Sequence, residues 1–173
     1  MVKKPKIAKA QGRITFEQLR AEITYDPETG IVRRLVDRSS NARAGDFAGY
    51  IHSGCGRMYV CLLGTTYLLH RVAFFYMTGR WPLQMIDHIN GDPTDNCWVN
   101  LREATPQQNC ANSRRRKDNT SGHKCIRRLR NHWQVRIGRG GINHIGTYDT
   151  LNEAISQRDA AISRHFGEYG RRD

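Results

Sequence analysis

The chain lacks a long apolar run and has no close pair of cysteines. None of its hydrophobic segments approaches the ~20 residues that a membrane-spanning helix needs, and its first residues form no hydrophobic signal segment. Its five cysteines are odd in number and include no Cys-x-x-Cys pair. We therefore expect a cytoplasmic protein with no membrane contact, no disulfides and no structural zinc site.

Acidic residues are scarce relative to basic ones. The 173 residues include 28 Lys and Arg against 16 Asp and Glu, which gives a net charge of +12. Between Ser113 and Arg139 there are ten basic residues and one acid. A charge run is often only a solvated face or a linker, but this one accompanies a strongly basic chain. We expect a polyanionic partner, and nucleic acid is the natural candidate.

The length suits one medium domain or two small ones. The first 13 residues are Lys-rich and indicate a basic, disordered arm. Changes in composition then predict an α+β unit over residues 14–112, a basic linker over 113–121 and a second unit over 122–170.

Local patterns predict the elements of both units. In the first we expect two helices, near 16–23 and 68–78, and strands over 31–36, 45–51, 58–63 and 85–89. Capping boxes at Thr15, Thr105 and Thr150 predict three helix starts, and Gly79 with Pro82 predicts the end of the helix near 68–78. Pro106 and Gln108 support the start at Thr105, and we expect that helix to continue into the arginines after Ser113. In the second unit we expect three short strands covered on one face by a helix, over 124–130, 132–138, 143–148 and 151–165.

One set of polar residues suggests a catalytic site. Asp87 and His88 end a short strand, and Asn100 and Asn109 follow 13 and 22 residues after Asp87. Oxygen ligands from Asp87 and Asn109 would suit a hard cation such as Mg²⁺. His88 would then be left to deprotonate water, which is the equipment for cutting a phosphodiester bond.

These residues belong to a longer pattern that resembles the HNH nucleases of phage homing endonucleases. The resemblance covers about residues 14–112 and is carried by Leu69-His70-Arg71-Val72-Ala73, Asp87-His88-Ile89-Asn90-Gly91-Asp92, Asp95-Asn96, Asn100-Leu101-Arg102 and Gln108-Asn109. It implies a ββα-metal fold with a small N-terminal sheet extension. It also implies that His88 is the general base, that Asp87 and Asn109 bind Mg²⁺ or Mn²⁺, and that Asn100 ties down the loop that aims His88. We expect His70 to be a structural residue beneath that loop.

The second unit resembles the DNA-binding domain of plant ethylene-response factors. The resemblance is carried by Ser121-Gly122, Ile126-Arg127, Trp133-Gln134-Val135-Arg136-Ile137, Ile145 to Thr150, Glu153-Ala154 and Asp159-Ala160-Ala161. It implies a three-stranded antiparallel sheet that lies in the major groove, with Arg127 and Arg136 as base or phosphate contacts. Separately, the alternation of Trp133 with Val135 and Ile137 predicts that Trp133 belongs to the core. The full set of expected DNA-binding residues is Arg114, Arg115, Arg116, Lys117, Arg127, Arg128, Arg130, Gln134, Arg136 and Arg139.

These patterns together predict a monomeric, divalent-metal-dependent endonuclease of duplex DNA with no small-molecule cofactor. The resemblance adds that it is phage-encoded and works in a bacterial host cell. An alternative is a protein that binds specific DNA without cutting, on a scaffold derived from a nuclease. RNA binding or cleavage is a third possibility, because a basic groove does not distinguish the two polymers.

Overall fold

The computed structural model describes residues 14–138 and 145–172. It divides into two compact units, with the boundary between Glu103 and Ala104. The expected basic arm over 1–13 and the expected DNA contact Arg139 lie outside the described residues.

The first unit begins with a helix and a hairpin. Thr15 caps α1 (Phe16–Glu22) through a capping box with Gln18, as the sequence predicts. The hairpin pairs β1 (Ile23–Tyr25) antiparallel with β2 (Val32–Arg34). The strand expected over 31–36 is therefore shorter. Leu35, which is 48% exposed, and Val36 lie in a bend after its end.

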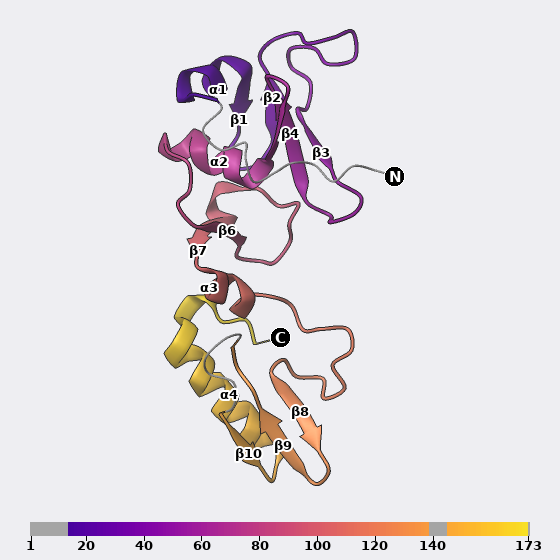
Figure 1. Cartoon of the computed structure of the whole chain (residues 1–173), viewed down its shortest axis with the longest axis vertical. Coiled ribbons are helices and arrows are strands. Elements are labelled where there is room, and N and C mark those ends of the chain that lie inside the picture. The colour runs from indigo at the N-terminus through magenta and orange to yellow at the C-terminus, as the bar shows by residue number, and fades with distance from the viewer. Residues whose placement is uncertain (1–13, 139–144, 173) are drawn as a thin grey trace. The chain divides into compact units, whose positions relative to one another are not determined.

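A three-stranded antiparallel sheet follows, in the order β3-β4-β5, of which β3 and β4 are labelled in Figure 1. Its strands are β3 (Gly49–Ile51), β4 (Met58–Leu62) and β5 (Thr65–Leu68). The sequence prediction lacked β5. Leu63 and Gly64 both have positive φ, 48° and 73°, which is the backbone that a two-residue hairpin turn needs. Leu63 is an unusual residue for that conformation, so the turn was not apparent.

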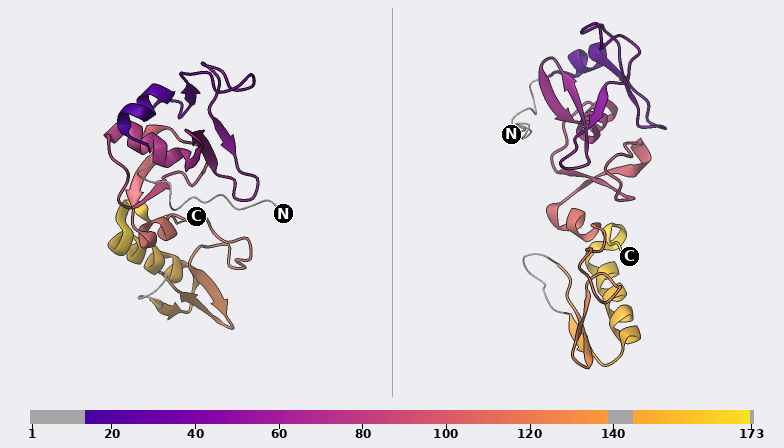
Figure 2. Two further views of the ribbon diagram at one scale, coloured as in Figure 1. Left: turned by 45° about the horizontal axis from the view of Figure 1, so that its top comes forward. Right: turned by 90° about the vertical axis from the view of Figure 1, so that its right-hand side faces the viewer.

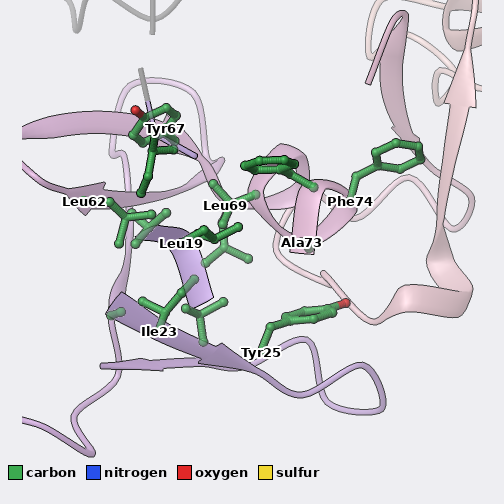
Figure 3. Packing of buried hydrophobic residues seen from close by; sticks show 14 of the residues in the cluster. Leu19, Ile23, Tyr25, Leu62, Tyr67, Leu69, Ala73 and Phe74 are labelled. Carbon is green, nitrogen blue, oxygen red and sulfur yellow. The ribbon is translucent and has the colours of Figure 1, made fainter. Parts of the chain in front are cut away.

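The core of the first unit forms around α2 (Leu69–Thr78), which ends at Gly79 in the left-handed conformation, as expected. Buried side chains from α1, the hairpin and the sheet surround it (Figure 3). They include the fully buried side chains of Leu19, Ile23, Val60 and Leu69. At the edge of this cluster the hydroxyl of Tyr25 points away from Ile23 and Leu19 (Figure 3).

After α2 the chain forms a small two-stranded sheet from β6 (Met85–His88) and β7 (Leu101–Ala104). The 3-10 turn η1 (Trp98–Asn100) leads directly into β7. The segment between the two strands, residues 89–100, contains Asn100 of the expected catalytic site and is named the catalytic loop for that expectation.

The second unit starts with α3 (Pro106–Ala111). Thr105 and Gln108 form its capping box, and Pro106 is its first residue, as the sequence predicts. The expected continuation into the arginines is wrong. The helix ends at Asn112, and the Ser113 hydroxyl donates to the Cys110 carbonyl at 2.7 Å.

The rest of the second unit is a three-stranded antiparallel sheet covered by one helix. The strand order is β10-β9-β8, from β8 (Ile126–Leu129), β9 (His132–Val135) and β10 (Gly146–Tyr148). Helix α4 (Leu151–Phe166) lies along one face of this sheet (Figure 2) and is followed by the turn η2 (Gly167–Tyr169). The sequence predicts these three strands and this helix. The first two strands are shorter than expected, and residues 143 and 144 of the third expected strand lie outside the described residues.

Apolar side chains between that sheet and α4 form a second core. Ile126, Val135 and Ile137 from the sheet side meet Ala154 and Ile162 of α4. Trp133 is only half-buried and packs against this cluster, so the expectation that it belongs to the core holds in part. None of the described helices has the length and apolarity that crossing a bilayer would require.

Candidate active site

The end of β6 carries two buried polar side chains, Asp87 and His88, which are 6% and 8% exposed. Met85 and Ile86 begin the strand, and Ile86 belongs to the apolar core of the first unit. This anchoring fixes the backbone from which Asp87 and His88 project. The strand that the sequence predicts therefore does place the two expected catalytic residues at the start of the catalytic loop.

Asn100 closes the catalytic loop. Its Oδ1 accepts from the Asn90 backbone N–H at 2.9 Å, and its Nδ2 donates to Asn90 Oδ1 at 3.1 Å and to the Asp95 carbonyl at 2.8 Å. Its own carbonyl accepts from the Ile89 N–H at 2.9 Å. Contacts of this kind are needed if Asn100 holds the loop in place, which is the role that the resemblance implies. A role of Asn100 in catalysis stays a prediction.

His88 lies between two further polar residues. Its Nε2 is 3.3 Å from Asn96 Oδ1, and its ring meets the ring of His70 edge-on at a centroid distance of 5.0 Å. Burial lowers the pKa of His88, although the Asn96 hydrogen bond and the Asp87 charge oppose this shift. The imidazole is therefore neutral near pH 7, the state in which it can accept a proton.

His70 lies in the first turn of α2 and is 5% exposed. Burial lowers its pKa well below the usual value for histidine, and the nearby His88 lowers it further. Its Nδ1 is buried without a hydrogen-bond partner among the described residues. A neutral ring packed edge-on beneath His88 agrees with the structural part expected for His70.

Asp87 forms an ion pair with Arg102, a residue for which the sequence predicts no role. The Nε of Arg102, on β7, donates to Asp87 Oδ2 at 3.1 Å. Asp87 carries the carboxylate type of ligand that a hard cation commonly uses, together with water and phosphate oxygens. Among the described residues no three His, Cys, Asp or Glu side chains come together in a group that could hold a metal ion.

The other expected metal ligand, Asn109, lies on α3 in the second unit and is described there. Its backbone N–H donates to the Thr105 carbonyl at 2.9 Å, so the residue closes the first helical turn, where the sequence places it. Its side chain is partly exposed. Its part as a ligand stays a prediction.

The expected DNA-binding residues of the second unit fall into two groups. Arg127 and Gln134 are directly paired across β8 and β9, and Arg127 Nε donates to Gln134 Oε1 at 2.7 Å. Val135 and Ile137 are buried while Arg136 between them is exposed, so the alternation of β9 continues past its end. Arg128 lies over the Trp133 ring at 5.6 Å. Arg130 is in the β8–β9 turn with a φ of 52°.

The second group lies in the segment that follows α3. A hollow of about 760 Å³ is lined by basic side chains of this segment and of the sheet, among them Arg114, Arg115, Arg116, Lys124, Arg127 and Arg136. Arg116 also pairs with Asp118 at 2.8 Å, but both side chains are well exposed. Lys117 is exposed too. The second unit therefore presents concentrated positive charge around a concave surface, as phosphate binding requires.

Three residues that contact the site have no role that the sequence predicts. Arg102 and Asn96 belong to the HNH-like pattern, but the pattern does not show that they contact Asp87 and His88. Tyr25 had no signal, because its hydroxyl donates to the Asn96 carbonyl at 2.7 Å across 71 residues of sequence. Only the folded chain brings β1 to the catalytic loop.

Two comparisons with known proteins found similarities. Residues 67–111 match the HNH endonuclease family. The chain is also similar to an uncharacterized HNH endonuclease of Acanthamoeba polyphaga mimivirus, with 31% identity over 105 residues that cover 58% of this chain and 54% of that protein. The chain thus spans about half the length of the curated relative that it matches. No solved structure matches the chain.

Residues 67–111 are therefore similar to the HNH endonuclease family, and both similarities support a nuclease, that is, a phosphodiester hydrolase. They give no support to the ethylene-response-factor resemblance of residues 122–170 or to a phage origin. Those two expectations stay predictions.

Proposed function

We propose that the protein is a divalent-cation-dependent endonuclease that hydrolyses phosphodiester bonds of duplex DNA. The observation that carries this proposal is the pair Asp87–His88, buried and anchored at the start of a loop inside the region that matches the HNH endonuclease family. A carboxylate beside a neutral imidazole supplies both a cation ligand and a base.

In this proposal His88 accepts a proton from the water whose oxygen attacks phosphorus. The bond between phosphorus and the 3′ oxygen breaks, and that oxygen leaves opposite to the attacking water. Asp87 would hold the cation, and the resemblance implies Asn109 as a second protein ligand. A cation bound there would stabilise the negative charge on the phosphoryl oxygens and on the departing oxygen. Asn100 keeps the catalytic loop closed around His88.

The second unit would supply DNA affinity. Arg127, Gln134 and Arg136 would meet the duplex, and the basic segment at 114–117 would contact phosphates. Support comes from the exposed polar side chains of the sheet and from the basic lining of the hollow. The homing role of the gene rests on the resemblance alone.

Nicking of supercoiled plasmid tests the proposal. The wild-type protein should cut in Mg²⁺ or Mn²⁺ and lose activity in EDTA. The His88→Ala variant should lose at least the ~10²–10⁴-fold that a general base contributes, with DNA affinity nearly unchanged. His52→Ala is the matched control, because His52 also lies in the first unit but contacts Cys55 and Tyr59 instead of the catalytic loop. Equal cutting by both variants would overturn the assignment of His88.

Binding without cutting is the alternative function. It would appear as wild-type protein that shifts duplex DNA in a gel but leaves plasmid intact in either cation. RNA as the preferred substrate would appear as faster cleavage of a matched RNA duplex.

A further inference from the structure

The turn between β1 and β2 contacts three consecutive residues of the catalytic loop. The Tyr25 hydroxyl donates to the Asn96 carbonyl at 2.7 Å, and the Pro27 carbonyl accepts from the Trp98 N–H at 2.8 Å. Tyr25 is itself buried, at 4% exposure, and its ring packs edge-on against Tyr76 of α2. The hairpin is thus anchored in the core of the first unit at the point where it contacts the loop.

Gly30 completes this contact. A Cβ on this residue would lie 2.4 Å from the carbonyl carbon of Asn96 and 2.6 Å from the amide nitrogen of Cys97. Both distances are far below ordinary van der Waals contact, and both opposing atoms belong to the backbone. The φ of Gly30 is also +70°. The backbone of the hairpin can therefore lie directly against the loop only if this residue has no side chain.

Asn96 transmits this contact to His88. Its side chain is fully enclosed at 1% exposure, and its Nδ2 donates to the Thr94 carbonyl at 3.0 Å. Because a carbonyl can only accept, the nitrogen end of the amide must face Thr94 and the oxygen end must face His88. The amide oxygen can only accept as well, so a neutral His88 carries its proton on Nε2. The basic nitrogen is then Nδ1.

We propose that the β1–β2 hairpin positions the general base through Asn96. The hairpin fixes the backbone of Asn96, and the side chain of Asn96 fixes the ring orientation and the tautomer of His88. Tyr25, Gly30 and Asn96 are positioning residues in this proposal, because they act through His88. The proposal rests on the proposed function for its effect on cleavage, but it also makes a prediction about the protein alone.

The first test removes one hydroxyl. Tyr25→Phe should lower kcat for plasmid nicking by about 2–10-fold, the range that one neutral hydrogen bond supports, with KM for DNA unchanged. Tyr59→Phe is the matched control. Tyr59 is equally buried, at 3% exposure, but its hydroxyl is 3.6 Å from Cys55 Sγ and does not contact the catalytic loop. An equal kcat for the two variants would overturn the proposal.

The second test adds one methyl group. Gly30→Ala should lower kcat by more than Tyr25→Phe does, because the loop backbone at Asn96 and Cys97 must move. Gly64→Ala is its control, since Gly64 has nearly the same φ, +73°, but no heavy atom within 4 Å of its Cβ position. Both variants carry the same backbone strain. A similar kcat loss in both would show that strain alone is responsible and would overturn the proposal.

The third test reads His88 without DNA or metal. In long-range ¹H–¹⁵N spectra at mildly alkaline pH, wild-type protein and Tyr59→Phe should show His88 protonated on Nε2. Asn96→Leu should show a mixture of the two tautomers. In Tyr25→Phe the fraction of His88 protonated on Nδ1 should be higher than in the wild-type protein. Wild-type His88 protonated on Nδ1 would overturn the proposal. If wild-type protein cuts no nucleic acid, the proposed function fails, while this spectrum still decides whether Asn96 sets the tautomer.

Discussion

The Nε of Arg102 lies 3.1 Å from Oδ2 of Asp87, and both side chains are mostly buried, at 12% and 6% exposure. A carboxylate buried to this extent is stable as an anion only if positive charge or hydrogen-bond donors are near it. Arg102 supplies both from the neighbouring strand β7. The residue expected to bind the cation is thus held in a fixed orientation by a cationic side chain of the neighbouring strand.

Arg102→Met should therefore destabilise the first unit by about 3 kcal/mol, the lower end of the cost of removing one partner from a buried ion pair. Urea denaturation measures this change. Arg80→Met is the control: Arg80 pairs with Glu103 at 2.7 Å, but with 50% and 25% exposure, so its loss should cost less than about 1 kcal/mol. Adding Asp87→Asn should recover part of the Arg102→Met loss. An equal loss of unfolding free energy in the two single variants would show that Arg102 stabilises the unit no more than an exposed ion-pair partner does.

Asp87→Ala and Asn109→Ala should each remove most nicking and raise the Mn²⁺ concentration needed for half-maximal rate. Oxygen ligands predict support by Mg²⁺ or Mn²⁺ and no requirement for Zn²⁺. Rates measured over a series of cation concentrations separate weaker cation binding from a slower reaction. Asp118→Ala serves as the control, because Asp118 pairs with Arg116 on the surface. Cleavage that persists in EDTA would show that no divalent cation is needed.

The local elements of this fold were readable because their signals are local. The capping boxes at Thr15, Thr105 and Thr150 each involve residues three apart, and all three helices begin where those boxes predict. Helix α2 ends at a glycine for the same reason. By contrast β5 depends on a turn through Leu63, whose positive φ is imposed by strand pairing and not by residue type.

In the candidate site, too, the residues close together in the sequence were predicted and those far apart were not. Asp87, His88 and Asn100 were found because they lie within 14 positions of one another in a recognisable order. The residues that hold them in place were not found from the sequence. Arg102 contacts Asp87 from the neighbouring strand, and Tyr25 contacts Asn96 across 71 residues of sequence. The length of α3 was overestimated because arginine favours helices, whereas the hydrogen bond of Ser113 to the Cys110 carbonyl follows the end of the helix.

Acid should destabilise the first unit through its buried histidines. The pKa of His70 is lowered well below its usual value near 6.5 by burial, and that of His88 is also lowered. Below pH ~6.5 the unfolded chain therefore binds protons that the folded unit does not, so stability falls as pH falls, by up to about 1.4 kcal/mol per pH unit for each histidine. His70→Phe should reduce this slope in urea denaturation between pH 7 and pH 5. An unchanged slope would mean that His70 is protonated in the folded protein.

A fragment of residues 104–173 should fold by itself, because Ile126, Val135 and Ile162 belong to a core made only from its own sheet and helix. It should be more stable than a fragment of residues 120–173. The shorter fragment loses the Ala111 carbonyl, which accepts from the Arg171 N–H at 3.2 Å and from the Lys124 ammonium. Two hydrogen bonds at about 1 kcal/mol each predict a difference of about 2 kcal/mol in thermal or urea denaturation. Equal stability would show that α3 adds nothing to this unit.

Arg136→Ala should weaken DNA binding, because Arg136 is exposed on the side of the sheet opposite to Val135 and Ile137, which face α4. If its guanidinium reads a base edge, the loss should be roughly 1–3 kcal/mol at the preferred site and smaller elsewhere. If it contacts only phosphate, the loss should be similar on every sequence, and the dependence of log K on log salt should fall by about 0.9. Binding is best measured in the His88→Ala background, so that the DNA stays intact. Arg164→Ala is the matched control, since Arg164 is equally exposed but lies on α4. A larger loss from Arg164→Ala than from Arg136→Ala would place the DNA on the helix and not on the sheet.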